Sequence, residues 1–294
     1  MQTPHLAAES SIGLIAGWGR FPLSVSAKLK SLGHHVVCVA IKGHADRELE
    51  RYCDHVFWSG VGRFGAHVRF FRRHGVSHLT MAGKLFKHEI LYGGGLLLRH
   101  RPDFTCVRTF WPYLMSRQRD ARDDSLLSAV INTYERNQMT MQAATDLVPE
   151  LLATDGLLAG EPLSSKIAAD ADSGWQIAKT MGGLDIGQAI TIRDGVVIAV
   201  EAIEGTDACI QRTGSLCRRG GWTLVKVAKP NQDMRFDVPT IGTQTVQMVA
   251  DAGGRAIVIE AGRTILLDAS ETIALANQLG VAIQARRSTG AAAI

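Results

Sequence analysis

The sequence predicts an α/β protein of two domains, with a Rossmann-like parallel sheet in residues 1–139 and a mixed sheet in residues 140–294. Its length of 294 residues exceeds that of one average domain. Near the start, a short apolar run, a glycine turn, a helical pattern and a second apolar run succeed one another, which indicates a βαβ unit and a parallel sheet. In the second half, an Asp-Gly pair between two β-rich runs predicts an antiparallel hairpin.

The first domain is expected to alternate strands with helices. The apolar run 12–16 breaks at Gly17-Trp18-Gly19-Arg20, and Pro22 then opens a helical pattern. Asp123 and Asp124 precede another helical spacing, where an acidic pair suits the positive end of the helix dipole. The same contrast between apolar runs and turn residues predicts strands over 36–41, 56–58 and 78–82 and helices over 23–32 and 64–74.

The second domain is expected to combine the hairpin with further strands and helices. The hairpin spans residues 188–202 around Asp194-Gly195. A helix is predicted after Gly205, with Thr206 as its N-cap, because a threonine hydroxyl can accept a bond from the first helical turn. The remaining predictions are strands over 222–227, 256–260 and 264–267 and helices over 243–252 and 270–279.

The composition is that of a globular protein. Its 46% hydrophobic and 20% charged residues exclude collagen-like and wholly disordered chains. A net charge of +4 fits an anionic ligand or membrane surface but is too weak to indicate nucleic acid. The five cysteines form no Cys-x-x-Cys pair, which argues against structural zinc and fits a reducing cytoplasm. No apolar run approaches 18 residues, so we expect no membrane-spanning helix.

A basic and aromatic stretch covers residues 99–122. One interpretation is a solvated helix face with its own core residues; the other is a surface for an anionic membrane or lipid headgroup. The residues concerned are Arg99, Arg101, Arg108, Arg117, Arg119 and Arg122, with Phe104, Phe110, Trp111 and Tyr113 between them.

The glycine turn after the first predicted strand is a candidate anion site. Gly17 and Gly19 would bring backbone N–H groups to an anion at the N-terminus of the following helix. Lys84 follows another strand end, and open α/β sheets bind ligands outside the carboxyl ends of their strands, so it could meet a phosphate in the same crevice. Pro22 occupies the third glycine position of a dinucleotide fingerprint, which argues against NAD(P). A plain turn and a surface lysine are the alternatives.

Two further clusters of charge lie in the second domain. Glu201, Glu204 and Asp207 fall within seven residues, but the alternation of a strand keeps all three from converging simply. Thr206 and Asp207 form either a helix cap or part of a phosphate or metal-bound water site.

The segment 225–242 is the most informative, because its mixed charges between prolines cannot form a core element. We interpret it as a rigid loop in which Asp233 and Asp237 face Mg²⁺ and Lys226, Lys229 and Arg235 face phosphate oxygens. A salt-bridged loop without a ligand is the alternative.

These clusters, in this order, resemble the LpxI-type UDP-2,3-diacylglucosamine diphosphatases of bacterial lipid A biosynthesis. The resemblance covers about residues 11 to 285, and its most specific motifs lie toward the C-terminus. The matching segments are IAGWGRFP (15–22), AGK (82–84), RDDSLL (122–127), LDIGQA (184–189), AVEAIEGTDA (199–208), KPNQDMRFDVPTIG (229–242) and EAG (260–262).

The resemblance implies a Mg²⁺-dependent, two-domain enzyme that hydrolyses UDP-2,3-diacylglucosamine to UMP and 2,3-diacylglucosamine 1-phosphate. Asp237 occupies the family's catalytic position, and Asp233 ranks below it as a supporting acid and metal ligand. The residues expected to bind substrate are Gly17, Gly19, Lys84, Gln188, Thr206, Asp207, Lys226, Lys229 and Arg235. We expect a cytoplasmic protein that contacts the inner membrane transiently, and leave a homo-oligomer open.

Three other functions stay open at this point. An oxidoreductase acting on a sugar nucleotide would need the fingerprint and the ribose-binding acid that the sequence lacks. A nucleotide or lipid sensor without turnover would have little use for paired aspartates in the loop 225–242. A diphosphatase for another UDP-sugar is compatible with every motif above.

Overall fold

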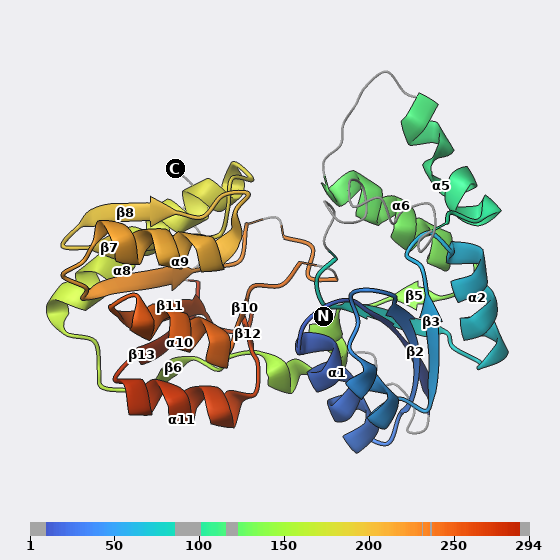
Figure 1. Cartoon of the computed structure of the whole chain (residues 1–294), viewed down its shortest axis with the longest axis horizontal. Helices are drawn as coiled ribbons and strands as arrows, with labels where there is room; N and C mark the ends of the chain where they lie inside the picture. The colour runs from blue at the N-terminus through green and yellow to red at the C-terminus, as the bar shows by residue number, and fades with distance from the viewer. Residues whose placement is uncertain (1–9, 86–100, 116–122, 231, 236, 289–294) are drawn as a thin grey trace. The chain divides into compact units, whose positions relative to one another are not determined.

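The computed structural model divides the chain into two compact units (Figure 1). It describes residues 10–85, 101–115, 123–230, 232–235 and 237–288. Unit 1 comprises Met1–Pro149 with Met234–Phe236, and unit 2 comprises Glu150–Asp233 with Asp237–Ile294. The main division follows Pro149, whereas the sequence places it after residue 139. The difference arises because residues 140–141 form a strand that pairs within the sheet of unit 1.

Unit 1 contains a five-stranded sheet in the order β3-β2-β1-β4-β5, in which every pairing is parallel. This confirms the Rossmann-like parallel sheet. Its strands are β1 (Ser11–Ala16), β2 (His35–Ile41), β3 (His55–Ser59), β4 (His78–Ala82) and β5 (Thr140–Met141). The first four match the predicted strands, because each carries a short, mostly apolar run bounded by turn residues, and β1 and β2 are buried after their first residue.

The helices of unit 1 cover both faces of this sheet. On one face, α1 packs against β1, β2 and β4. On the other, Phe71 of α2 and Tyr134 of α6 are fully buried against alternate residues of the sheet such as Val37 and Val39. The elements are α1 (Phe21–Ser31), η1 (Arg47–Arg51), α2 (Phe64–Arg73), α5 (Phe104–Met115), α6 (Asp123–Glu135) and α7 (Ala144–Leu147).

Unit 2 contains a six-stranded mixed sheet in the order β6-β13-β11-β9-β7-β8. The predicted hairpin is confirmed: β7 and β8 pair antiparallel, and Asp194 and Gly195 turn between them with φ of 53° and 77°. The strands are β6 (Gly156–Ala159), β7 (Ala189–Arg193), β8 (Val196–Val200), β9 (Trp222–Lys226), β11 (Gly254–Glu260) and β13 (Ala282–Arg286). A separate parallel pair joins β10 (Thr240–Ile241) to β12 (Ile265–Leu266).

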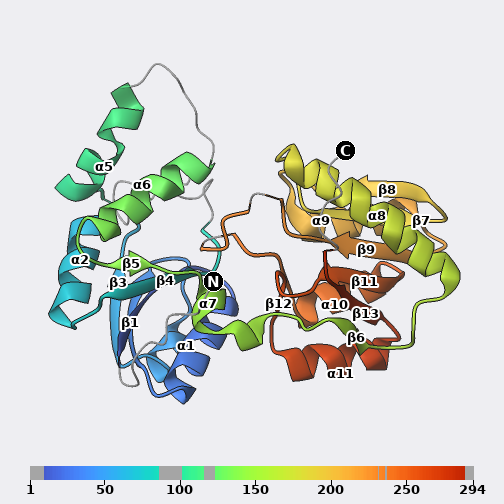
Figure 2. The ribbon, with the colours of Figure 1, turned by 180° about the vertical axis from the view of Figure 1, so that it is seen from behind.

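Helices also cover both faces of the second sheet. The long helix α8 packs on β7 and β9 from one side, whereas α9, α10 and α11 pack on the other (Figures 1 and 2). The alternation of β9 matches this arrangement, because Val225 joins the core under α8 while Trp222 and Leu224 join the opposite core. The helices are η2 (Pro149–Leu151), α8 (Ser165–Gly183), α9 (Gly205–Leu216), α10 (Thr243–Asp251) and α11 (Ala269–Leu279).

One predicted detail of α9 is wrong. Glu204 is the N-cap, and Thr206 lies inside the first turn of the helix. The Thr206 hydroxyl instead donates to the Glu201 carboxylate at 2.8 Å. A strong local acceptor therefore competes with the capping role that the sequence suggests.

Substitution of Gly83 tests how closely the backbone segments pack at the sheet edge of unit 1. Gly83 has φ of +92°, and an added Cβ would lie 2.8 Å from the backbone of Gly17 and Trp18. Gly43 has φ of +81° but open space around it. We expect Gly43→Ala to cost about 1–2 kcal/mol for the left-handed backbone, and Gly83→Ala to cost a further ~1–3 kcal/mol for overpacking. Urea unfolding of both variants measures the difference, and equal costs would contradict the close approach.

Candidate active site

The loop that follows β9 folds back on itself around Gln232. The Gln232 side chain accepts the Lys229 N–H at 2.7 Å and donates to a carboxylate oxygen of Asp237. The Asp237 N–H in turn bonds the carbonyl oxygen of Asp233 at 3.2 Å. The loop thus presents the Asp237 carboxylate in a defined position rather than as a free surface acid.

The Asp237 carboxyl lies in a mixed electrostatic environment. Burial raises its pKa above the ordinary aspartate value, and the charge of Glu201 acts in the same direction. The ammonium groups of Lys229 and Lys226 and the hydrogen bond from Gln232 lower the pKa, but the net shift is upward. The charge of the Asp237 carboxylate is therefore incompletely compensated. Groups with such shifted pKa values cluster at functional sites.

Lys226, the last residue of β9, connects the loop to the start of α9. It is buried, and its Nζ donates to the Thr206 hydroxyl at 3.0 Å and to the Thr240 carbonyl at 3.1 Å. The Thr206 hydroxyl donates to buried Glu201, whose other oxygen accepts the Gln188 N–H at 3.4 Å. The buried charges of Lys226 and Glu201 are therefore linked through one hydroxyl group.

Two contacts complete this network. Lys229 Nζ lies 2.6 Å from Asp185 Oδ1, and Gln232 Nε2 lies 3.3 Å from Gln188 Oε1. The structure therefore brings together five of the predicted residues, namely Gln188, Thr206, Lys226, Lys229 and Asp237. It adds three that sequence reasoning did not assign to the site, Glu201, Gln232 and Asp185.

Other predicted residues of the second half lie outside this network. Asp207 is exposed on α9, where its carboxylate accepts a bond from Gln244 at 3.2 Å. Glu204 pairs with Arg212 at 2.8 Å, so the three acids of this segment do not converge, as expected. Arg235 belongs to unit 1, and its guanidinium lies 3.9 Å from Glu135 of α6.

The predicted residues of unit 1 form a backbone cradle at the carboxyl ends of β1 and β4. Trp18 and Lys84 exchange backbone hydrogen bonds at 2.8 and 2.9 Å, and the Gly17 N–H bonds the Ala82 carbonyl at 2.8 Å. Strand order reverses at this point, between β1 and β4, which is where open α/β sheets bind ligands. A cavity of about 360 Å³ opens beside Gly19, lined by Trp18, Arg20, Leu23, His44, Ala45, Asp46 and Glu48.

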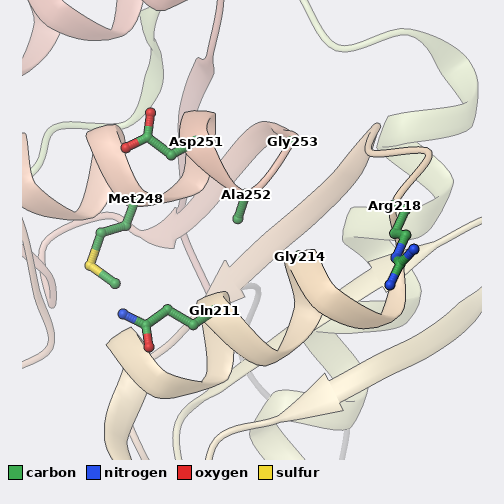
Figure 3. Close-up of a pocket in the computed structure, with 7 residues that line it drawn as sticks. All are labelled: Gln211, Gly214, Arg218, Met248, Asp251, Ala252 and Gly253. Atoms are coloured by element: carbon green, nitrogen blue, oxygen red, sulfur yellow. The ribbon is translucent and has the colours of Figure 1, made fainter.

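A larger concavity, of about 570 Å³, lies elsewhere on unit 2 (Figure 3). It is formed by Gln211, Gly214, Arg218, Met248, Asp251, Ala252 and Gly253, from the ends of α9 and α10. The end of α10 leads into the start of β11, so this concavity lies at the opposite strand edge from Lys226. None of the predicted site residues lines it, and we do not assign the chemistry to it.

The helix α5 carries part of the predicted basic and aromatic surface. Phe104, Val107 and Trp111 are exposed at spacings of three and four residues, and Arg101 and Arg108 are exposed beside them. Another side of α5 packs against α2, where the ring centroids of Phe110 and Phe64 lie 5.9 Å apart. The residues Arg99, Arg117, Arg119 and Arg122, and the side chain of Tyr113, lie outside the described part of the chain.

The residues of the acidic loop that could hold a cation are Asp237 and Asp233. Within the described ranges, no group of three or more His, Cys, Asp or Glu side chains is arranged to hold a metal. Magnesium usually takes one or two carboxylates and completes its shell with waters and substrate phosphates. An added cation would also offset the charge of Asp237, whose pKa burial raises.

Comparisons with known proteins cover nearly all of the chain. The family model described as LpxI N-terminal domain matches residues 11–151. The family model described as LpxI C-terminal domain matches residues 154–284. The chain is also 31% identical over 283 residues to the UDP-2,3-diacylglucosamine pyrophosphatase LpxI of Caulobacter vibrioides. That alignment covers 92% of this chain and 95% of the Caulobacter protein. The two family matches meet close to the division between the units.

The raised pKa of Asp237 predicts a pH-dependent stability cost. In the unfolded chain the pKa of this carboxyl is about 4. At pH values below it, the carboxyl is protonated in both the folded and the unfolded state. As the pH rises through the folded pKa, burying the charged form makes the native protein less stable. With EDTA present, we expect Asp237→Asn to melt above the native protein at pH 7 and to lose this advantage near pH 4. Melting temperatures across this pH range test this; a variant less stable at every pH would contradict it.

Proposed function

Because this chain belongs to the LpxI family, we propose that it is an enzyme that hydrolyses the diphosphate of UDP-2,3-diacylglucosamine to UMP and 2,3-diacylglucosamine 1-phosphate. The observation that carries this proposal is the half-buried Asp237 carboxylate, which Gln232 holds close to the charges of Lys226 and Lys229. A diphosphate carries charge that such ammonium groups can offset.

The proposed mechanism assigns a task to each part of the network. Lys229 and Lys226 lower the electrostatic cost of bringing phosphate oxygens close to an acidic loop. Asp237 orients the attacking water, and its raised pKa makes it a better proton acceptor than an ordinary aspartate. The Gln188 and Gln232 amides fix this geometry without adding charge. In the alternative role, Asp237 would hold Mg²⁺ instead of accepting a proton, with Asp233 in support, and the ion would polarise a phosphoryl oxygen.

The residues of unit 1 are proposed to bind substrate phosphate at their own sheet edge. Gly17 packs against the Lys84 backbone, where an added Cβ would lie 2.6 Å from the carbonyl oxygen, whereas open space surrounds Gly19. The N-terminus of α1 favours anions. No acidic residue lies in the first turn of α1, and Lys84 is exposed at the neighbouring strand end. The sequence and structure thus support phosphate or nucleotide recognition at this edge.

A diacylated substrate also requires access to lipid. In the part of the chain that the structure describes, no helix is long and apolar enough to cross a bilayer. We propose that α5 contacts an anionic membrane surface through Phe104 and Trp111, which are 80% and 56% exposed. Exposed aromatic side chains with flanking arginines suit the interface of a bilayer with anionic headgroups.

Release of UMP from UDP-2,3-diacylglucosamine tests the proposed activity. We expect turnover with Mg²⁺, none with EDTA, and a fall in kcat of about 10²-fold or more for Asp237→Asn. Asp251→Asn is the matched control, because this exposed acid on α10 bonds only a neighbouring glutamine in the described structure. It should keep native turnover. Robust turnover by Asp237→Asn would transfer the catalytic role to Asp233 or Asp207.

Sedimentation with phosphatidylglycerol-containing vesicles tests the membrane contact. Burying one aromatic side chain contributes roughly 1.5–3 kcal/mol, so the double variant Phe104→Ser/Trp111→Ser should bind at least about tenfold more weakly. Leu216→Ser is the control, because Leu216 is 63% exposed on α9 in unit 2 and should not affect binding. Equal binding by native protein and double variant would contradict the role of α5.

A further inference from the structure

We propose that the buried Glu260 and the half-buried Lys179 form an ion pair that positions the catalytic loop of unit 2; this inference rests on the proposed function. The pair holds both backbone groups of Ala228, the second residue after β9. Glu260 Oε2 accepts the Ala228 N–H at 2.8 Å, and Lys179 Nζ donates to the Ala228 carbonyl at 2.9 Å. The two side chains lie 2.7 Å apart. They are positioning residues, because they act on the loop rather than on substrate.

The position of Ala228 explains why side chains, rather than a neighbouring strand, bond its backbone groups. The preceding residue, Val227, still bonds the Gln188 carbonyl on the β7 side of the sheet at 3.0 Å. On the other side, β11 ends at Glu260 and offers no further backbone partner in register. Ala228 is fully buried, so its N–H and carbonyl groups must be satisfied within the protein. The ion pair does this where the chain leaves the sheet toward Asp237.

The end of α8 supports the same stretch of loop. Lys179 and Gly182 lie three residues apart on one side of α8, and Asp185 follows just beyond the end of the helix. A Cβ on Gly182 would lie 3.2 Å from the Lys229 Cα, so the helix and the loop pack closely. Asp185 pairs with Lys229 at 2.6 Å. The loop is therefore anchored over two successive residues, Ala228 and Lys229.

The Glu260 carboxylate depends strongly on its partner. It is completely buried, and its Oε2 accepts both bonds, whereas its Oε1 makes no hydrogen bond within the described structure. A buried charge loses its compensation when the opposite charge is removed. Glu260→Gln keeps the volume and one acceptor for Ala228, but it no longer attracts Lys179 electrostatically. This change should loosen the loop while the surrounding core is kept.

The experiment compares the full-length native protein with Glu260→Gln by two measurements. Amide hydrogen exchange, without substrate, should be faster by about tenfold or more in peptides covering residues 227–239 and unchanged in the rest of unit 2. The kcat for UMP release should fall about 10–10²-fold, because a small misplacement of a catalytic group is costly. KM should stay within about twofold, since the residues that bind phosphate are retained.

Asp170→Asn is the matched control. Asp170 is a buried carboxylate on the same helix that also accepts two backbone N–H groups, those of Asp194 and Gly195, at the far hairpin. If Glu260 only stabilised the fold, both Glu260→Gln and Asp170→Asn would lose activity only through unfolding. Our proposal predicts that Asp170→Asn keeps native kcat per folded molecule and native exchange in the loop.

The outcomes separate the proposal from its alternatives. If Glu260→Gln does not fold, the neutral double variant Lys179→Met/Glu260→Gln should fold and still show a low kcat. Native kcat in either variant, or loop exchange equal to that of the native protein, would overturn the positioning role. Absence of UMP release by the native protein would refute the proposed function instead, and it is observed before any variant is compared. The exchange measurement then still decides whether the pair holds the loop.

Discussion

The burial of a cation at the end of β9 is the constraint on which the rest of the site depends. Lys226 ends a central strand and is only 8% exposed, so its ammonium group must find partners inside the protein. They are the Thr206 hydroxyl and the Thr240 carbonyl, and Thr206 in turn contacts Glu201. One buried charge thereby connects the segment from the end of β8 to the first turn of α9 with the strand β10, which is distant from it in sequence.

The loop beyond Lys226 combines firm anchoring with incomplete charge compensation. At its start, backbone groups are held by side chains from α8 and β11, and further along Gln232 holds the Asp237 carboxylate. Two lysines act on Asp237, yet burial outweighs them and its pKa stays raised. A protein optimised only for stability would avoid such a carboxylate or pair it directly. Its presence is understandable if a cation or a proton completes the site during the reaction.

The sequence predicted most strands of both sheets because each is a short apolar run bounded by turn residues, as in β1, β2 and the β7–β8 hairpin. It missed α8, whose Gly174, Gly182 and Gly183 weaken the helical pattern. It proposed Asp237 and its lysines as site residues because the segment 225–242 concentrates charges in an otherwise apolar chain. Asp185 was not assigned to the site, because its partner Lys229 lies far along the chain and no local pattern encodes such pairing. Glu201 was not assigned either, because the alternation of a strand does not show that its carboxylate accepts the Thr206 hydroxyl.

The glycine at position 174 shows why a weak helical pattern can be a requirement of the site. Inside a helix, glycine costs roughly 1 kcal/mol relative to alanine. Here a Cβ would lie 2.8 Å from Val225 of β9 and 3.3 Å from Ile192 of β7, so only glycine lets α8 approach this sheet so closely. Lys179 lies five residues further along the same helix and bonds Ala228 at 2.9 Å. Moving α8 outward by the thickness of a methyl group would stretch that bond beyond hydrogen-bonding distance. The residue that obscures the helix in the sequence is therefore one that allows the helix to hold the loop that follows β9.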